Sequence, residues 1–214
     1  MFAEEAPLKR LRVMLKAGVK DFKRTASFFP SSPTLVADMV APLRLQRAKL
    51  VVEFGVGTGV ITQALLERMP SNAKLLAFEL NATLAEFARS QLADPRLEIV
   101  CRGAQELLSD LSARGKREVD AIASSLGLTL MPDRTRHEIL RTVVGALKPS
   151  GVFTQLVYMH GIAVPWKKFE GGLQPFPADE FLEDYFRHIE REWVLRNAPP
   201  AFVYVCREPI RSSP

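Results

Sequence analysis

The sequence predicts an α/β protein whose mostly parallel sheet is covered by helices on both faces. Three observations support this fold class. Short apolar runs alternate with amphipathic stretches five times between residues 49 and 158, glycines cluster directly after the first run, and two more β-like runs follow near residues 190–196 and 201–206. Strands that alternate with helices form parallel sheets. We therefore expect a seven-stranded sheet that ends in an antiparallel pair of strands.

Length and composition fit one globular domain. The chain has 214 residues, of which 47% are hydrophobic and 25% are charged, an ordinary balance for a folded domain. Its two cysteines, Cys101 and Cys206, form no CxxC pair and the three histidines are scattered, so we predict no metal site and no disulfide framework. No apolar run approaches the ~20 residues that span a bilayer, and no secretory signal opens the chain. These features predict a cytoplasmic protein.

The first segment, residues 7–24, is predicted to be an amphipathic helix that stands apart from the sheet. Apolar residues recur along it at helical spacing, and its other side carries seven lysines and arginines against the single acid Asp21. A second helix should begin after Ser32, which is well placed as its N-cap, with Pro33 at the first helical position. We therefore divide the chain into a helix and linker over residues 1–28 and one domain over residues 29–214.

The central part of the chain contains the alternating elements. We predict strands over residues 49–54, 74–79, 97–101, 119–124 and 152–158, and helices over residues 58–68, 82–92, 104–111 and 133–147. Asp133 is expected to cap the last of these helices, and a turn at residues 148–151 should lead into the fifth strand. The segment 161–177, rich in proline, glycine and aromatic residues, is predicted to be a loop.

The glycine loop after the first strand indicates the kind of ligand. Its glycines stand at Gly55, Gly57 and Gly59, and Val60 occupies the place where a dinucleotide-binding loop has its third glycine. The acid Glu53 precedes the loop, where a carboxylate would oppose a pyrophosphate but suits the ammonium and sulfonium groups of S-adenosylmethionine. Glu79 ends the next strand, at the interval of about 20 residues where an acid binds a ribose diol. The pattern predicts S-adenosylmethionine as cofactor, with S-adenosylhomocysteine as its product.

Outside this loop the sequence resembles the bacterial phospholipid N-methyltransferases, class I enzymes of Rossmann-like fold that methylate the amine of phosphatidylethanolamine towards phosphatidylcholine. The resemblance runs from about residue 29 to residue 204 and rests on six stretches. These are residues 30–32, 51–59, 120–126, 128–132, 155–158 and 196–201. The last stretch, Arg-Asn-Ala-Pro-Pro-Ala, is the most telling because the cofactor fold does not require it.

The resemblance implies a set of site residues. The cofactor would be lined by Glu53, Phe54, Gly55, Gly57, Gly59, Glu79, Leu80, Gly103, Ala104 and Ser124. Tyr158 would orient the amine through its hydroxyl or its ring face, and His160 would accept a proton or contact phosphate. Ser124 and Ser125 would border the transferring methyl group. The acid that the family places after the third strand, against adenine, is absent; Gln105 or the backbone would have to serve instead.

The basic helix fits a substrate that lies in a membrane. A basic amphipathic helix can lie in the bilayer interface, and each basic residue near an anionic leaflet contributes at most roughly 1 kcal/mol. We therefore expect residues 8–24 to dock on an anionic membrane surface, with an amino-phospholipid as substrate. This places the protein peripherally on the inner face of the cell membrane. Packing of the same helix against the edge of the sheet is the alternative.

Three other functions stay open. The first is methylation of an ornithine lipid on the same scaffold. The second is dimethylation of adenine in ribosomal RNA, whose enzymes share the glycine loop but need a stacking aromatic and an asparagine where this chain has Ser124-Ser125-Leu126, so we expect no nucleic-acid partner. The third is a non-catalytic membrane-binding module, against which the intact Gly55, Gly57 and Glu79 argue. The oligomeric state does not follow from the sequence.

Overall fold

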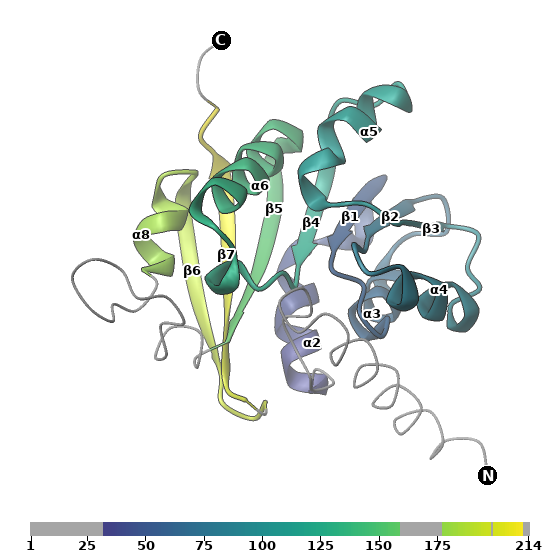
Figure 1. The fold of residues 1–214 in the computed structure, drawn as a ribbon, viewed down its shortest axis with the longest axis horizontal. Helices are drawn as coiled ribbons and strands as arrows, with labels where there is room; N and C mark the ends of the chain where they lie inside the picture. Colours follow the sequence, from purple (N-terminus) through teal and green to yellow (C-terminus); the bar gives the residue numbers. More distant parts are fainter. Residues whose placement is uncertain (1–31, 159–176, 198, 212–214) are drawn as a thin grey trace.

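The computed structural model describes residues 32–158, 177–197 and 199–211, and these residues form one seven-stranded sheet (Figure 1). The strand order is β3-β2-β1-β4-β5-β7-β6. The strands are β1 Leu50–Phe54, β2 Lys74–Phe78, β3 Leu97–Val100, β4 Val119–Ser124, β5 Leu147–Tyr158, β6 Phe186–Val194 and β7 Ala201–Pro209. Strands β1 to β5 pair in parallel, and β7 pairs antiparallel with both β5 and β6. The predicted fold class is confirmed.

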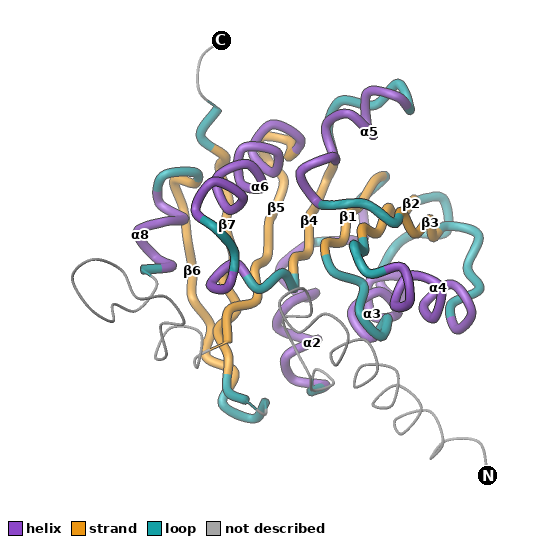
Figure 2. The backbone as a smooth tube through the Cα atoms, in the orientation of Figure 1, coloured by secondary structure: helices purple, strands orange, loops and turns teal. Residues whose placement is uncertain are grey.

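Helices cover both faces of this sheet (Figure 2). They are α2 Pro33–Val40, α3 Val60–Arg68, α4 Ala82–Gln91, α5 Leu107–Ala113, α6 Asp133–Ala146 and α8 Ala178–Glu183. Alternation along β1 separates the two cores, because successive side chains of a strand point to opposite faces. Val51 packs in the core shared with α2 and α3, whereas Val52 and Phe54 pack in the core shared with α5, α6 and α8.

The helix α2 begins as the sequence predicted. The Ser32 hydroxyl accepts a hydrogen bond from the Leu35 amide at 3.2 Å, and Pro33 occupies the first turn. The prediction for α6 was wrong in one detail. Its N-cap residue is Pro132, which provides no side-chain cap, and Asp133 lies inside the first turn, where it forms an ion pair with Arg136.

Strand β5 begins five residues earlier than predicted, at Leu147 instead of Val152. The extra segment pairs with β4 through a register shift between Val119 and Ala121. The Asp120 carboxylate holds this region together, since it accepts hydrogen bonds from the amides of Lys49 and Leu50 at 2.7 and 2.9 Å and pairs with Lys148. The predicted turn at residues 148–151 is therefore part of the strand.

The boundaries of other elements also differ from the predicted ones. The helix expected over residues 104–111 is a short 3-10 turn, Ala104–Glu106, followed by α5. The strand expected near residues 190–196 is β6, Phe186–Val194, and the helix α8 was not predicted. The helix predicted over residues 7–24 and the loop 161–176 lie outside the described residues.

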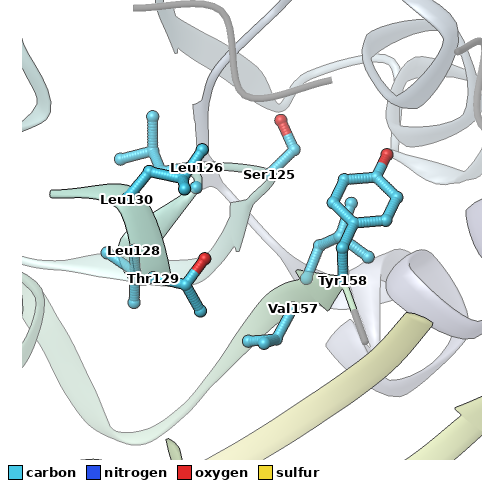
Figure 3. Close-up of a pocket in the computed structure, with 9 residues that line it drawn as sticks. Ser125, Leu126, Leu128, Thr129, Leu130, Val157 and Tyr158 are labelled. Atoms are coloured by element: carbon cyan, nitrogen blue, oxygen red, sulfur yellow. The ribbon is translucent and has the colours of Figure 1, made fainter. Parts of the chain in front are cut away.

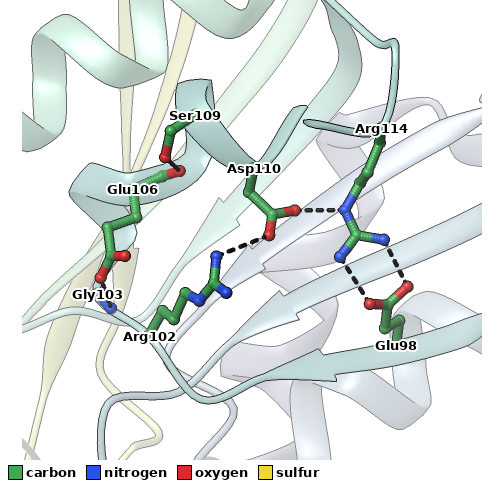
Figure 4. A network of polar contacts seen from close by, with 7 residues as sticks. All are labelled: Glu98, Arg102, Gly103, Glu106, Ser109, Asp110 and Arg114. Atoms are coloured by element: carbon green, nitrogen blue, oxygen red, sulfur yellow. Dashed lines mark hydrogen bonds and ion pairs between the residues drawn. The ribbon is translucent and has the colours of Figure 1, made fainter. Parts of the chain in front are cut away.

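A polar network joins α5 to the edge strand β3 (Figure 4). The buried carboxylate of Asp110 accepts hydrogen bonds from Arg114 and, at 3.5 Å, from Arg102. Arg114 also donates hydrogen bonds to both carboxylate oxygens of Glu98, at 2.7 and 2.6 Å. A bidentate pair of this kind fixes orientation as well as distance. The Arg114–Glu98 pair fixes the end of α5 against β3, and Arg102 joins the segment after β3 to the same network.

Candidate functional site

The glycine loop lies at the carboxyl end of β1, between the ends of β2 and β4. Gly55, Gly57 and Gly59 all have positive φ angles, of 85°, 54° and 79°, which glycine adopts at the lowest cost. Their surroundings differ. A Cβ on Gly55 would lie 2.7 Å from the Ser125 Oγ, and one on Gly59 would lie 2.7 Å from the Leu92 Cδ1.

A Cβ on Gly57 would meet nothing within 4 Å in the described part of the chain. Gly57 therefore presents bare backbone to open space, as expected of a ligand seat. Gly59 has a structural role, because a side chain at this position would collide with Leu92 where α3 begins. Only part of the glycine motif is thus available to a ligand.

Glu79 follows β2 and is hydrogen-bonded to the glycine loop. Its Oε2 accepts from the Gly57 amide at 2.9 Å, and its Oε1 accepts from the Asn81 amide at 2.8 Å. Burial raises the pKa of Glu79, while backbone amides that include these two lower it. Each carboxylate oxygen has a second lone pair, so Glu79 can shape the loop and still accept a hydrogen bond from a ribose.

Glu53 is the most unusual group at this edge. Its side chain is 1% exposed, and neither carboxylate oxygen has a hydrogen-bond partner among the described residues. Burial raises the pKa of Glu53 to about 8. The neighbouring Thr62 hydroxyl lowers this pKa, and the charge of Glu79 raises it. A buried acid without a partner is costly. A cation at this edge would supply the missing partner.

The two serines that end β4 have different positions. Ser125 lines a pocket, and its hydroxyl donates to the Gly55 carbonyl at 2.8 Å. Ser124 is fully buried, and its Oγ accepts from the Leu126 amide at 3.4 Å. Phe54 is also buried and its ring packs edge-on against Phe78 in the core, with centroids 5.8 Å apart. Phe54 therefore reaches the site only through its backbone. Its carbonyl accepts a hydrogen bond from the Ser125 amide at 2.9 Å.

The pocket lies between the loop after β4 and the end of β5 (Figure 3). Its lining residues are Ser125, Leu126, Gly127, Leu128, Thr129, Leu130, Leu156, Val157 and Tyr158. Five of the nine lining residues are aliphatic, and Ser125, Thr129 and Tyr158 carry hydroxyl groups. Tyr158 ends β5, as predicted, and lies in the wall of this pocket.

Gln155 supports the pocket from behind and was not recognised from the sequence as a site residue. Its side-chain amide donates to the carbonyls of Leu126 and Leu156 at 2.9 and 2.6 Å. The Gln155 Oε1 is buried and has no partner in the described residues. A glutamine in a largely apolar stretch of β5 was the available signal, because a buried polar side chain needs a structural reason.

The remaining predicted residues lie at the ends of β2 and β3. Leu80 directly follows Glu79 and is 57% exposed, which is unusual for a large apolar side chain at a strand end. Gly103 begins the 3-10 turn, and its amide donates to Glu106 at 3.3 Å. The Gln105 side chain lies over Gly103, where a Cβ would come within 2.6 Å of the Gln105 Oε1. Ala104 is buried.

His160 lies outside the described residues, as does the segment 8–24. Among the residues the structure describes, no group of three or more histidine, cysteine or acidic side chains is arranged to hold a metal ion. Within the same residues, no helix is long and apolar enough to span a bilayer.

The residues at this edge fit S-adenosylmethionine. Its ammonium and sulfonium groups can partner the unpaired Glu53 carboxylate, and its ribose can share Glu79 with the loop amides. The open approach to Gly57 leaves room for the ligand, and the exposed Leu80 can pack against a flat base. A dinucleotide would instead bring its phosphates towards Glu79 and would leave the buried Glu53 without a cationic partner.

Comparison with known proteins agrees with this chemistry. Residues 51–151 match a family model described as a methyltransferase domain. The ornithine lipid N-methyltransferase of Singulisphaera acidiphila is 28% identical over 183 residues, covering 85% of this chain and 88% of the relative. A SAM-dependent O-methyltransferase from Thermotoga maritima has a similar structure, with a TM-score of 0.61 and 18% identity, covering 92% of this chain and 72% of that one.

A second solved structure bears on the cofactor. The N-methyltransferase NodS from Bradyrhizobium japonicum, in complex with S-adenosyl-L-homocysteine, has a TM-score of 0.61 at 13% identity, covering 84% of this chain and 89% of that one. At these identities the solved structures establish the fold. With the match of residues 51–151 to a methyltransferase-domain model, they support S-adenosylmethionine as the cofactor.

Proposed function

We propose that the protein transfers methyl groups to the primary amine of a membrane aminolipid, with ornithine lipid as the first candidate and phosphatidylethanolamine as the second. The observation that carries this proposal is the pocket at the ends of β4 and β5. Five of its nine lining residues are aliphatic and three carry hydroxyl groups, and Ser125 joins it to the glycine loop through a 2.8 Å hydrogen bond. A pocket that combines aliphatic side chains with hydroxyl groups suits a lipid whose reactive end is an amine.

The cofactor seat would be formed by the bare backbone at Gly55 and Gly57 and by the acids Glu53 and Glu79. Leu80 and the backbone of residues 103–104 would contact the adenine. S-adenosylmethionine supplies an activated methyl group when bound. The protein then has to hold donor and acceptor in line and keep water out, which is the main contribution of an enzyme to such a transfer.

Tyr158 is the residue we assign to the amine. The amine must lose a proton to water before its lone pair can form the new N–C bond while the C–S bond breaks. The Tyr158 hydroxyl can accept a hydrogen bond from the neutral amine, and its ring face can stabilise the cation that forms. Ser125 would border the reacting carbon, and His160 is a further candidate to receive the proton.

The choice between the two lipids rests on similarity. The curated relative, named an ornithine lipid N-methyltransferase, matches this chain over most of its length, whereas the six stretches noted above resemble the phosphatidylethanolamine enzymes. Both head groups combine a primary amine with an anionic group. The basic segment at residues 8–24 would bring the protein to the anionic inner face of the cell membrane.

The test is a transfer assay on the full chain. Purified protein is incubated with labelled S-adenosylmethionine and vesicles that contain ornithine lipid, phosphatidylethanolamine or neither, beside a ribosomal RNA control. We expect label in the aminolipid vesicles alone, and mass spectrometry of the extracted lipid then counts the methyl groups. Label in RNA and none in lipid would overturn the proposal in favour of an RNA methyltransferase.

Variants of Tyr158 separate its two possible contributions. Tyr158→Phe keeps the ring face, and Tyr158→Ala removes both ring and hydroxyl. We expect the kcat of Tyr158→Ala to be at least about tenfold lower than that of Tyr158→Phe. The reason is that the ring face, which only Tyr158→Ala removes, stabilises the cation that forms during transfer. Equal activity of wild type and Tyr158→Ala would show that the acceptor amine lies elsewhere.

A further inference from the structure

We propose that the tip of the β6–β7 hairpin is a membrane-contact surface of the protein, beside the mouth of the acceptor pocket. This hairpin tip surface consists of Trp193, Leu195 and Arg196. The proposal rests on the proposed function, because an enzyme that draws its substrate from a bilayer must touch that bilayer near its active site. Its partner is an anionic lipid surface.

Two large apolar side chains are exposed on this surface. Trp193 is 56% exposed near the end of β6, and Leu195 is 65% exposed in the turn that follows this strand. Trp193 is held in position, because its ring packs edge-on against Phe202 at 4.6 Å and the Arg191 guanidinium lies 5.8 Å from its centre. Tryptophan is enriched at membrane interfaces because its ring is apolar and its N–H is polar.

Strand pairing puts this surface level with the pocket. Val194 pairs with Ala201, and Ala201 pairs in turn with Tyr158. Figure 1 shows the β6–β7 hairpin reaching beyond the end of β5, at the bottom of the view. A bilayer that accepts Trp193 and Leu195 therefore lies at the same end of the sheet as the pocket wall.

The first described residue of the chain contacts this hairpin. The buried Asn197 accepts a hydrogen bond from the Ser32 amide at 2.9 Å and donates to the Pro199 carbonyl at 2.7 Å. Ser32 is the first described residue, and the residues before it include seven lysines and arginines against one acid over positions 7–24. With the exposed Arg196, this positive charge complements an anionic leaflet.

A second copy of the chain is a weaker candidate for this surface. It would pair along β6, the edge strand of the sheet, but that strand carries Arg187, Glu190 and Glu192 as exposed side chains. Charged residues on an edge strand oppose pairing between copies. These charges therefore disfavour a dimer that pairs along β6.

The experiment uses Trp193 itself as the probe. The chain has two tryptophans, so Trp166→Phe leaves Trp193 as the only one. We expect its emission to shift to the blue when vesicles of phosphatidylcholine and phosphatidylglycerol are added, and brominated acyl chains to quench it. These vesicles contain no aminolipid, so the signal reports docking and not turnover.

A double variant tests the contribution to binding. We expect Trp193→Ser with Leu195→Ser to weaken partitioning into the same vesicles at least about tenfold while leaving methyl transfer to aminolipid in detergent micelles within about twofold. Leu108→Ser, which changes an exposed leucine of α5, is the matched control and should partition like wild type.

The outcomes separate this inference from the proposed function. Unshifted Trp193 emission, or unchanged partitioning of the double variant, overturns the membrane contact even if the wild type methylates lipid. Association between protein copies that disappears in the double variant, without any effect on vesicle binding, assigns the surface to a dimer and also overturns it. Absence of lipid methylation by the wild type in micelles, by contrast, refutes the proposed function.

Discussion

Cofactor binding should release a proton from Glu53, and the variant Glu53→Gln should abolish that release. Burial raises the pKa of Glu53 to about 8 in the free protein, so at pH 7 the carboxyl is protonated in about nine molecules of ten. The cationic groups of S-adenosylmethionine favour the carboxylate. If they return the pKa to the range of an ordinary glutamate, binding at pH 7 releases about 0.9 proton from wild type.

The same linkage sets the pH dependence of affinity. Between pH 6 and pH 8 the wild-type affinity for S-adenosylmethionine should rise about 50-fold, because the ionised fraction of Glu53 in the free protein rises by that factor. Glu53→Gln has no proton at this site to lose. Its affinity should lack this rise.

Stability of the free protein changes in the opposite direction. The folded state holds the Glu53 proton up to about pH 8, whereas the unfolded chain loses it near the model value of 4.5. Stability due to the neutral acid is therefore present below pH 4.5 and is lost as the pH rises towards 8. Over that window wild type should lose up to about 5 kcal/mol relative to Glu53→Gln.

Titration calorimetry in two buffers of different ionisation enthalpy measures the proton release, and denaturant unfolding at several pH values measures the stability. Glu67→Gln, an exposed glutamate on α3, is the control and should behave as wild type. Equal proton release and equal pH dependence in wild type and Glu53→Gln would refute the assignment of Glu53 to the cationic cofactor.

Three further predictions follow from single side chains. Gly57→Ala should lower the free energy of unfolding by only about 1 kcal/mol, because alanine is strained at a positive φ. It should weaken S-adenosylmethionine binding at least about tenfold in calorimetry, because its Cβ enters the open space beside the loop. Unchanged affinity would place the ligand elsewhere. Asn197→Ala should lower the free energy of unfolding by about 2 kcal/mol, since it removes two hydrogen bonds of a buried side chain, and denaturant unfolding checks this. Asp110→Ala should lower the free energy of unfolding by about 2 kcal/mol. Arg102→Ala, at a half-exposed side chain, should lower it by less than about 0.5 kcal/mol. Equal losses in thermal unfolding would contradict the central position of Asp110 in the network.

The strands and the glycine loop could be predicted because their signals are local. Apolar runs marked β1 to β4 to within one or two residues, and the acids Glu53 and Glu79 identified the edge of the sheet where the loop lies. The start of β5 could not be found in this way. It depends on Asp120, which bonds to the chain at Lys49, Leu50 and Lys148, and contacts between such distant positions leave no periodic pattern.

The role of each site residue was harder to predict than its location. Phe54 and Glu53 are neighbours, but alternation along β1 sends the ring of Phe54 into one core and the Glu53 carboxylate to the opposite face. Gly59 matches the motif, yet Leu92 explains its missing side chain. Asn197 was noticed only as part of a family stretch, and its bond to the Ser32 amide became visible only in three dimensions.

The hydrogen bond between the Ser125 hydroxyl and the Gly55 carbonyl links two parts of the chain that are 70 residues apart. One belongs to the loop after β1 and the other to the wall of the pocket, and the parallel pairing of β1 with β4 holds both in register. In the proposed function, the separation between methyl donor and amine would therefore be set when the chain folds. Each catalytic cycle would then begin from the same spacing between the loop after β1 and the pocket wall.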